Sequence, residues 1–439
     1  MELPRAYFDA EHIPKDRFDQ IFCLPPGMPE SVDRPLLLVG ARGAGKTAYL
    51  LYLQRRQPTC SVRLDCFERL ASIARRTGRG PYLLSESVEQ RVRLRGMANC
   101  LLMAALVSES FALDATLEPA LEVVFDLLPR ELRPQGSSLL QRLSDLRSRA
   151  QDPLLLSRPL EEAAACSVFR CSAQHIGQVF ARSGACLNIL LDRADFVSES
   201  CAYPALELLD QSASYVAIVA TRPCPDGAAD WGTEIETKPD DHYDVLGLGN
   251  PPNRMDWIEF ASDALRRQLY AFPTLAGIAP EFLNVVSYYA KDSLRLGLHI
   301  LRSANIYSKA VDGGVGSGDI EASLKDAFKD QKRRLVERAA GLLEGLYPSF
   351  VKAVAGWPSL VMSQLHIQTI DAPIVVHIRG KASEATSQFS RLLSPSPGHK
   401  FVAACIRESI MHPHPGEVWC PGRRFEKVEF APLILWSPK

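Results

Sequence analysis

A short apolar run leads directly into a glycine-rich turn near the N-terminal end of this chain. Residues 36–39 read LLLV, which is typical of a strand that is buried on both faces of a parallel sheet. The next residues, 40–47, read GARGAGKT and match the pattern G-x-x-x-x-G-K-[ST] in full. Because a helix is expected to begin near Thr47, the sequence predicts a strand, a phosphate-binding loop (P-loop) and a helix in succession.

The residue types in this loop suit a nucleotide phosphate. Glycines allow backbone amide groups to close around phosphate oxygens, the Lys46 ammonium can reach the terminal phosphates, and the Thr47 hydroxyl can ligate magnesium. We therefore expect ATP with Mg²⁺ as the ligand, and a turn that binds nothing is the alternative. The positions expected to hold the nucleotide in this loop are Gly40, Ala41, Arg42, Gly43, Ala44, Gly45, Lys46, Thr47 and Ala48.

Further buried-strand patterns alternate with helical patterns along the chain. The strand candidates lie at residues 61–65, 187–192, 215–221 and, more weakly, 243–246. Apolar spacing of three and four residues predicts helices at 88–106, 115–128, 139–150 and 161–181. This alternation predicts an α/β fold with the parallel sheet of a P-loop NTPase, and only helices in a long insertion at about residues 80–182.

The sequence divides into three expected domains. Residues 1–250 form the P-loop ATPase domain, residues 251–310 a small helical lid domain, and residues 319–439 a C-terminal mixed domain of undetermined fold. The lid helices are expected at residues 257–268, 281–290 and 294–307, after a break at Pro251 and Pro252. A glycine-rich linker at 311–318 precedes a long amphipathic helix at 319–346, and strand candidates follow at 374–378 and 430–436.

An aspartate ends the strand predicted at residues 187–192. A carboxylate at the carboxyl end of a strand beside the P-loop strand can hold the magnesium ion, directly or through water. We therefore expect Asp192 to be the second protein ligand, together with Thr47. A helix cap would be the alternative role for an aspartate in this position.

With these motifs the chain resembles the STAND and origin-recognition-initiator branch of the AAA+ ATPases, over about residues 15–310. The resemblance implies that Thr221, at the end of the fourth strand, senses the γ-phosphate, with Arg222 beside it. It also implies that Arg295, in the segment KDSLRLG, is a second sensor that couples lid closure to the nucleotide. The alternatives are a solvated arginine after a strand for Arg222 and an exposed helix arginine for Arg295.

One residue departs from the pattern of this family. Many of its members carry a water-orienting glutamate directly after the magnesium aspartate, and here that residue is Arg193. Slow or partner-dependent hydrolysis is therefore expected. Asp195 is the nearest carboxylate in the sequence that could position water, and its alternative role is that of a loop or cap residue. A nucleotide-binding scaffold that does not hydrolyse ATP is the main alternative function.

Three weaker patterns were weighed against this interpretation. Residues 237–240 read TKPD and resemble the guanine-reading motif of GTPases, but no companion switch motif accompanies them. Basic residues on the predicted helix 319–346 could contact nucleic-acid phosphates, although interspersed acidic residues favour a solvated face. His412 and His414 with Cys405 and Cys420 could be drawn as a metal site, but surface-loop residues are favoured.

Composition limits the partners and the location. The chain has 50 basic and 51 acidic side chains, so a nucleic-acid site would have to be a local patch rather than a property of the whole surface. No uninterrupted apolar run approaches the roughly 18 residues that span a bilayer, and no CxxC pair occurs among the 11 cysteines. We expect a cytoplasmic protein without a membrane segment. The resemblance implies a homo-oligomer or a protein partner, in which a neighbour supplies an arginine, and Arg193, Arg222 or an arginine of the helical insertion could act this way. It also implies a role in DNA remodelling, signalling or prokaryotic defence.

Overall fold

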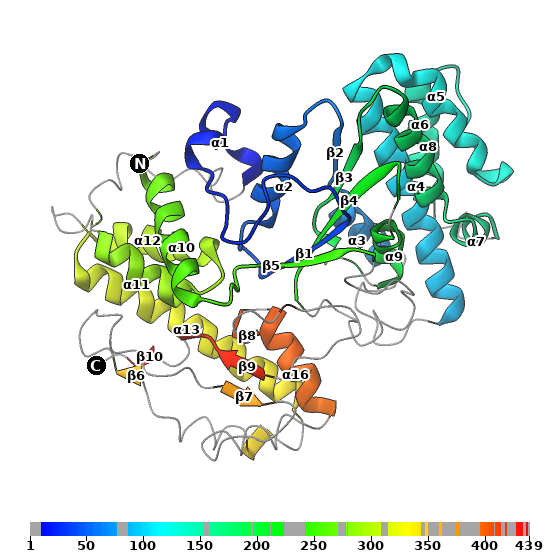
Figure 1. Ribbon diagram of the computed structural model, residues 1–439. Helices are drawn as coiled ribbons and strands as arrows, with labels where there is room; N and C mark the ends of the chain where they lie inside the picture. Colours follow the sequence, from blue (N-terminus) through cyan, green and yellow to red (C-terminus); the bar gives the residue numbers. More distant parts are fainter. Residues whose placement is uncertain are drawn as a thin grey trace.

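A five-stranded parallel sheet lies at the centre of the computed structural model (Figure 1). Its strands stand in the order β2-β3-β4-β1-β5. They are β1 (Leu36–Gly40), β2 (Ser61–Leu64), β3 (Leu187–Leu191), β4 (Tyr215–Thr221) and β5 (Asp244–Leu248). The five strands that the sequence predicts for the central sheet are therefore confirmed, and so is the parallel α/β sheet.

The structure describes the greater part of the chain. The described residues are 10–76, 87–152, 158–194, 197, 199–210, 212–223, 242–270, 278, 280–308, 315–343, 347–349, 360–361, 375–377, 396–407, 409–413, 418, 427–432 and 436–437.

Alternate residues of the central strands enter two separate cores. Leu36 and Leu38 of β1 pack with Leu50 of helix α2 (Lys46–Arg56) on one face of the sheet. Leu37 and Val39 belong to the larger core on the other face, with the insertion helices. Since successive side chains of a strand point to opposite faces, a continuous apolar run is what a sheet covered on both sides requires.

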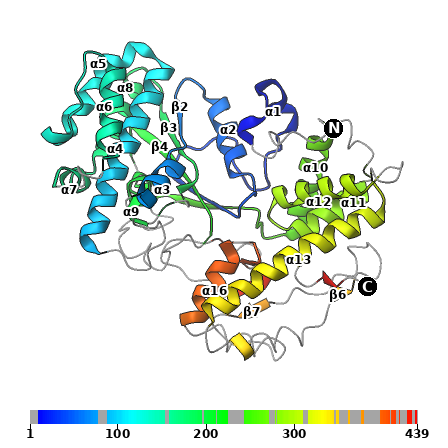
Figure 2. The same ribbon diagram turned by 180° about the vertical axis from the view of Figure 1, so that it is seen from behind.

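The segment between β2 and β3 is helical throughout its described part. It contains α3 (Phe67–Arg76), α4 (Val88–Leu113), α5 (Glu118–Glu122), α6 (Leu139–Arg149), α7 (Arg158–Ala165) and α8 (Val168–Arg182), with short 3₁₀ turns between them. These helices gather at the β2 end of the sheet, away from the helices α10–α12 at the other end (Figures 1 and 2). Helix α9 (Glu199–Leu206) follows β3.

Helix α4 is the centre of this insertion. By length and composition it is apolar enough to cross a membrane, with a mean hydropathy of 1.5, a property that the sequence analysis did not recognise. However, 67% of that stretch is buried inside the protein, where it contacts α6, α7, α8 and α9. This is the environment of a core helix of a globular protein.

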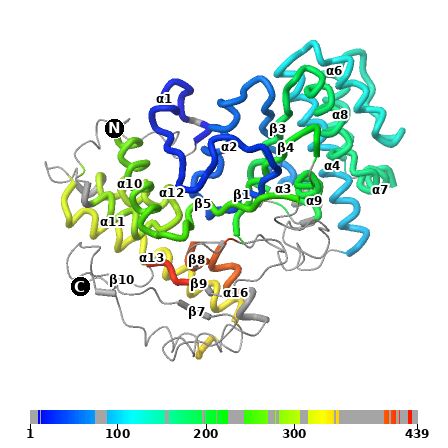
Figure 3. The backbone as a smooth tube through the Cα atoms, viewed as in Figure 1, coloured from blue at the N-terminus to red at the C-terminus, as the bar shows by residue number. Residues whose placement is uncertain are grey.

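Beyond β5 the chain forms helices and then a small mixed unit. The helices are α10 (Arg254–Tyr270), α11 (Pro280–Ala290), α12 (Leu294–Ser308) and α13 (Ser317–Leu342). Figure 3 shows α13 running from this group towards α16 (Ser396–Arg407). The remaining strands are β6 (Leu360–Val361), β7 (Val375–His377), β8 (Met411–Pro413), β9 (Lys427–Phe430) and β10 (Trp436–Ser437). Strands β7, β9 and β8 form an antiparallel sheet.

Several sequence-based boundaries are wrong. The helix predicted at 161–181 is two helices, because Ser167 takes the left-handed conformation (φ 45°) between α7 and α8. The helix predicted at 115–128 is a series of short turns around α5, whose first turn contains Pro119. The strand predicted at 430–436 is wrong as well, since β9 ends at Phe430.

Gly96 of α4 provides a test of the packing in the insertion. A Cβ at this position would lie 1.7 Å from the carbonyl oxygen of Leu160 in α7. Gly96→Ala should therefore force the two helices apart and lower the free energy of unfolding by about 1–3 kcal/mol. Gly341→Ala in α13 is the matched control, because a Cβ there meets no atom within 4 Å.

The control variant should be unchanged or slightly stabilised, by up to about 1 kcal/mol, since alanine is the better helix former. Urea denaturation followed by circular dichroism measures both effects. Equal stability of Gly96→Ala and the wild type would contradict the close contact between α4 and α7.

Candidate functional site

The loop between β1 and α2 has the backbone geometry of an anion-binding turn. Gly43 (φ 88°) and Gly45 (φ 104°) are both left-handed, a conformation that residues with a Cβ rarely adopt. Gly45 caps α2, whose first amide groups have no partner inside the helix. The Lys46 ammonium folds back over the loop and donates to the carbonyl oxygens of Gly40 (2.7 Å) and Ala41 (3.1 Å).

The N-terminal end of α12 lies directly against this loop. The Ser293 hydroxyl donates to the carbonyl of Arg42 at 2.9 Å, and the backbone amide of Arg295 donates to the carbonyl of Gly43 at 3.4 Å. A Cβ on Gly43 would lie 2.6 Å from the Cβ of Arg295. Glycine is therefore required at position 43 both for its backbone angle and for the close approach of α12.

A pocket of about 690 Å³ opens between the loop, the N-terminal segment and the helices α10 and α12. The loop contributes Arg42, Gly43, Ala44, Gly45, Lys46, Thr47 and Ala48. The other charged residues that line the pocket are Glu11, Glu68, Asp192, Arg193, Arg222 and Arg295. Its apolar lining includes Ile13, Phe18, Ile21, Phe22, Pro25, Phe260, Ala264, Leu294 and Leu298, with Gln268 among them.

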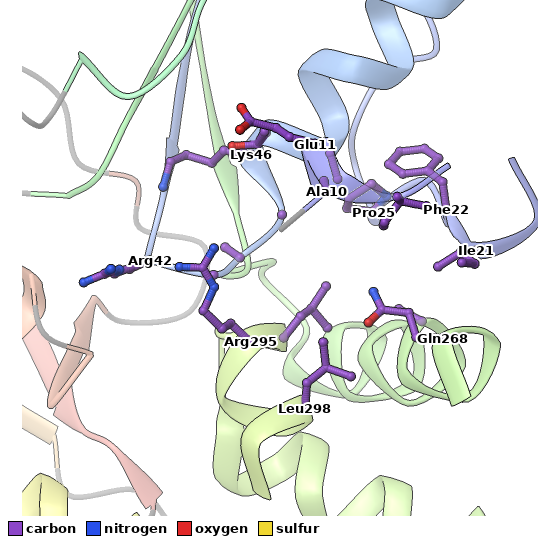
Figure 4. Close-up of a pocket in the computed structure, with 18 of the residues that line it drawn as sticks. Ala10, Glu11, Ile21, Phe22, Pro25, Arg42, Lys46, Gln268, Arg295 and Leu298 are labelled. Atoms are coloured by element: carbon purple, nitrogen blue, oxygen red, sulfur yellow. The ribbon is translucent and has the colours of Figure 1, made fainter. Parts of the chain in front are cut away.

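The pocket has a charged end and an apolar end (Figure 4). Lys46, Arg42 and Arg295 lie on one side in this view, whereas Ile21, Gln268 and Leu298 lie on the other. Such a cavity can take a ligand that is anionic at one end and flat and apolar at the other.

Asp192 follows β3 and is 1% exposed. Its Oδ2 accepts a hydrogen bond from Nη1 of Arg63 at 3.3 Å, and its Oδ1 is buried without a hydrogen-bond partner among the described residues. Burial raises the pKa of Asp192, and the Thr47 side chain and the positive charges of Arg63 and Lys46 offset this rise only in part. An unpaired buried carboxylate oxygen is costly, and a bound cation would satisfy it.

Thr47 and Asp192 fit a magnesium ion that is shared with phosphate oxygens. Both residues line the pocket. Within the described part of the chain, no group of three or more histidine, cysteine, aspartate or glutamate residues is arranged to hold a metal by itself. Mg²⁺ is commonly held by one or two protein oxygens with water and substrate phosphates, so these two residues are sufficient.

The other predicted site residues are only partly brought together. Arg222 and Arg295 line the pocket. Thr221 pairs with Val39 at the end of β4 and is fully buried, but it does not line the pocket, and its hydroxyl donates to the carbonyl of Arg222 at 3.4 Å. Asp195 lies outside the described residues.

Arg193 is held by carboxylates. Its backbone is left-handed (φ 64°), and its guanidinium contacts Glu11 (3.1 Å), Glu68 (2.8 Å) and Asp65 (3.7 Å). Glu11 belongs to the 3₁₀ turn η2 (Ala10–His12), far from the P-loop in sequence. Sequence reasoning missed Glu11 and the apolar N-terminal residues because no motif marks them, although Phe18, Ile21 and Phe22 recur at helical spacing around α1 (Lys15–Ile21).

The three weaker patterns have different outcomes. The TKPD segment at 237–240 lies outside the described residues. The basic side chains of α13 are exposed and Arg333 and Arg334 pair with Asp330 on the same helix, which agrees with a solvated face. The surface-loop interpretation of His412 is wrong, because His412 lies in β8, is 2% exposed and bonds to Asp292 at 3.0 Å.

The sequence matches no protein-family model and no curated protein.

Asp192→Asn should leave the ligand-free protein as stable as the wild type at neutral pH, or more stable. Since burial raises the pKa of Asp192, the folded protein holds this proton more tightly than the unfolded chain does. The charged form therefore costs stability at neutral pH, and this cost disappears as the pH falls below about 3.9, the usual pKa of an aspartate. Urea denaturation of both proteins at several pH values between about pH 4 and pH 7 measures the difference.

Asp330→Asn is the control of opposite sign. Partial burial of Asp330 is outweighed by hydrogen bonds and charge from Arg333 and Arg334, so its pKa lies below its usual value. This control should lose a little stability at neutral pH, within the range of about 0–1 kcal/mol for exposed ion pairs. A loss of about 2 kcal/mol or more in Asp192→Asn, as in a core substitution, would contradict the unfavourable environment of that carboxylate.

Proposed function

We propose that this protein binds ATP with magnesium and hydrolyses it slowly, as a cytoplasmic switch ATPase of the AAA+/STAND type. The observation that carries the proposal is the pocket of about 690 Å³ whose lining joins residues 42–48, Asp192, Arg222 and Arg295 to apolar side chains. A triphosphate fits the charged end, and an adenine base fits among the aromatic and aliphatic side chains of the other end.

The order of the strands supports this assignment. Strand β4 lies between β1 and β3, so the carboxyl ends of all three meet at one edge of the sheet. Parallel sheets bind their ligands at that edge. The P-loop after β1 and the aspartate after β3 therefore face the same phosphates, in the arrangement that the resemblance to AAA+ ATPases implies.

Each charged residue has a distinct role in this proposal. The backbone amides of residues 43–48 and the Lys46 ammonium bind the β- and γ-phosphates, and ATP would draw that ammonium away from the carbonyls of Gly40 and Ala41. Thr47 and Asp192 hold the magnesium ion, which when bound neutralises phosphate charge. Arg222 and Arg295 stabilise the negative charge that shifts during phosphoryl transfer.

The contact of α12 with the P-loop gives the protein a route for switching. Immediately before Ser293, Lys291 and Asp292 are buried and contact Glu429 of β9 (3.8 Å) and His412 of β8 (3.0 Å). A movement of the helical lid on nucleotide binding would therefore reach the C-terminal domain. A partner protein, a second copy of the chain or a nucleic acid would bind differently after this movement. Arg193 is unsuited to reach the nucleotide of a neighbouring subunit, because three carboxylates hold it.

A non-hydrolysing nucleotide-binding scaffold is the second candidate function. The observation that favours it is Arg193, which occupies the place of the water-orienting glutamate of the family that the sequence resembles. The protein would then use ATP as a structural ligand that holds the lid closed. Measured turnover separates the two functions.

Lys46→Ala tests the proposed function. The loss of one charge-assisted hydrogen bond to phosphate, about 1.5–3 kcal/mol, should weaken ATP binding by about 10- to 100-fold or more while the fold stays intact. Equilibrium binding of a fluorescent ATP analogue with Mg²⁺ measures it. Lys329→Ala removes an equally charged but exposed side chain of α13 and is the control. Unchanged affinity in Lys46→Ala would sink the assignment of the loop.

ATP should bind better than GTP. The apolar end of the pocket accounts for base binding without the TKPD segment, so Asp240→Asn is expected to leave the affinity for both nucleotides unchanged. Competition of unlabelled ATP and GTP against the labelled analogue measures the preference in both proteins. Equal binding of GTP that Asp240→Asn selectively removes would replace the ATP assignment with a guanine nucleotide.

A further inference from the structure

A glutamate from the N-terminal turn lies at the charged end of the pocket. Glu11 lines the pocket together with Lys46, Thr47 and Asp192. Its side chain is 22% exposed, so most of its surface is covered by the protein. This carboxylate comes from a segment that precedes β1 and carries no recognised motif.

Two guanidinium groups fix the orientation of this carboxylate. Oε1 of Glu11 accepts from Nη1 of Arg63 at 2.7 Å, and Oε2 accepts from Nη2 of Arg193 at 3.1 Å. The same Nη1 of Arg63 also donates to Oδ2 of Asp192 at 3.3 Å. Oε1 of Glu11 and Oδ2 of Asp192 thus accept from the same nitrogen of Arg63. Glu11 is therefore a neighbour of the proposed magnesium ligand.

The other carboxylates near Arg193 are less well placed. Glu68 lines the pocket but lies on α3 with its side chain 56% exposed, and among the described residues its ion pair is with Arg193. Asp65 follows β2 but does not line the pocket. Glu11 is thus the one carboxylate among these three that both faces the cavity and is held on both oxygens.

We propose that Glu11 orients the water that attacks ATP, and that Arg63 and Arg193 are positioning residues for Glu11. The inference rests on the proposed ATPase function. In the family that the sequence resembles, the position of Arg193 commonly carries the water-orienting glutamate. Here Arg193 instead holds Glu11, which comes from another part of the chain. The carboxylate has lone pairs left on both oxygens, so it can accept a hydrogen bond from water while the two arginines hold it.

The reaction balances with water as the co-reactant. The water oxygen forms a bond to the γ-phosphorus, and the bond from that phosphorus to the β–γ bridging oxygen breaks, leaving its electron pair on ADP. One proton of the water passes to the Glu11 carboxylate and from there to a phosphate oxygen or to solvent, so the glutamate is regenerated. Glu11 therefore acts by orientation and as a transient proton acceptor.

This assignment links hydrolysis to the docking of the N-terminal segment. Phe18 and Phe22, a few residues after Glu11, line the apolar end of the same pocket. A base that packs against these rings holds the segment in place, and with it the turn that carries Glu11. Binding of the correct nucleotide thereby helps to complete the hydrolytic site.

The test compares Glu11→Gln with the wild type in the full-length protein. The Kd for ATP and Mg²⁺ should change by less than about threefold, while single-turnover hydrolysis should fall by about 100-fold or more. Glu30→Gln is the matched control, because Glu30 also pairs with an arginine, Arg56, but outside the pocket. Its rate should equal that of the wild type, and thermal unfolding of each variant checks that the fold is retained.

A double-mutant cycle separates positioning from a general structural effect. Arg193→Gln should lower the hydrolysis rate, and adding it to Glu11→Gln should cause little further loss, because both changes remove one function. Additive losses would assign Arg193 to a different role and overturn the positioning part of the proposal.

The remaining outcomes are also decisive. Wild-type hydrolysis in Glu11→Gln, or a loss of hydrolysis in Asp65→Asn or Glu68→Gln but not in Glu11→Gln, would overturn the assignment of Glu11. A wild-type protein that binds ATP but does not hydrolyse it at any protein concentration would overturn this inference and leave ATP binding intact. A wild-type protein that fails to bind ATP would instead reject the proposed function itself.

Discussion

The loop between β1 and α2 is held in place by a segment that follows it by about 250 residues in the chain. Ser293 donates to the carbonyl of Arg42, and the amide of Arg295 donates to the carbonyl of Gly43. These bonds use carbonyl oxygens of the loop and none of its amide groups. The contact is possible only because Gly43 has no side chain. Residues of both the loop and α12 line the pocket.

The turn that precedes Ser293 extends this contact to the C-terminal domain. Lys291 is 6% exposed and Glu429 is 1% exposed, and Arg254 also pairs with this glutamate. Burial lowers the pKa of Lys291 to about 8, with the Arg254 charge adding to the effect, so its ammonium depends on the carboxylates around it. Buried charges that lose their partners are costly. The cluster therefore permits few arrangements, and α12 can move only if β8 and β9 move with it or if the cluster opens.

The sheet could be predicted from sequence because its signal is local, whereas most of the pocket could not. Five apolar runs, each ended by a polar residue or glycine, correspond to β1–β5, and the P-loop and Asp192 follow from position along those strands. Glu11 and Gln268 reach the pocket, and Arg63 reaches Glu11, through tertiary contacts between segments far apart in the chain, which no periodicity encodes. His412 is a similar case. Its local sequence indicated a surface loop, but in the structure it is buried and bonds to Asp292, a residue far away in the chain. Ser167 misled the helix prediction because its left-handed backbone interrupts an otherwise regular apolar pattern.

Arg193 also affects the balance of charge around the pocket. Four carboxylates, those of Glu11, Asp65, Glu68 and Asp192, lie around the guanidinium groups of Arg63 and Arg193, and the Lys46 ammonium also acts on Asp192. Burial, together with the nearby charges of Asp192 and Glu11, raises the pKa of Asp65 to about 6 even though Arg193 acts against the rise. This side of the pocket is therefore short of positive charge. Arg42 and Arg295 lie on the other side, where Figure 4 shows them away from Glu11. A magnesium ion favours the first side and phosphate oxygens favour the second, so the field of the protein itself would orient a metal–triphosphate complex. A glutamate in place of Arg193 would add to the excess of acid and leave Glu11 without one of its two partners.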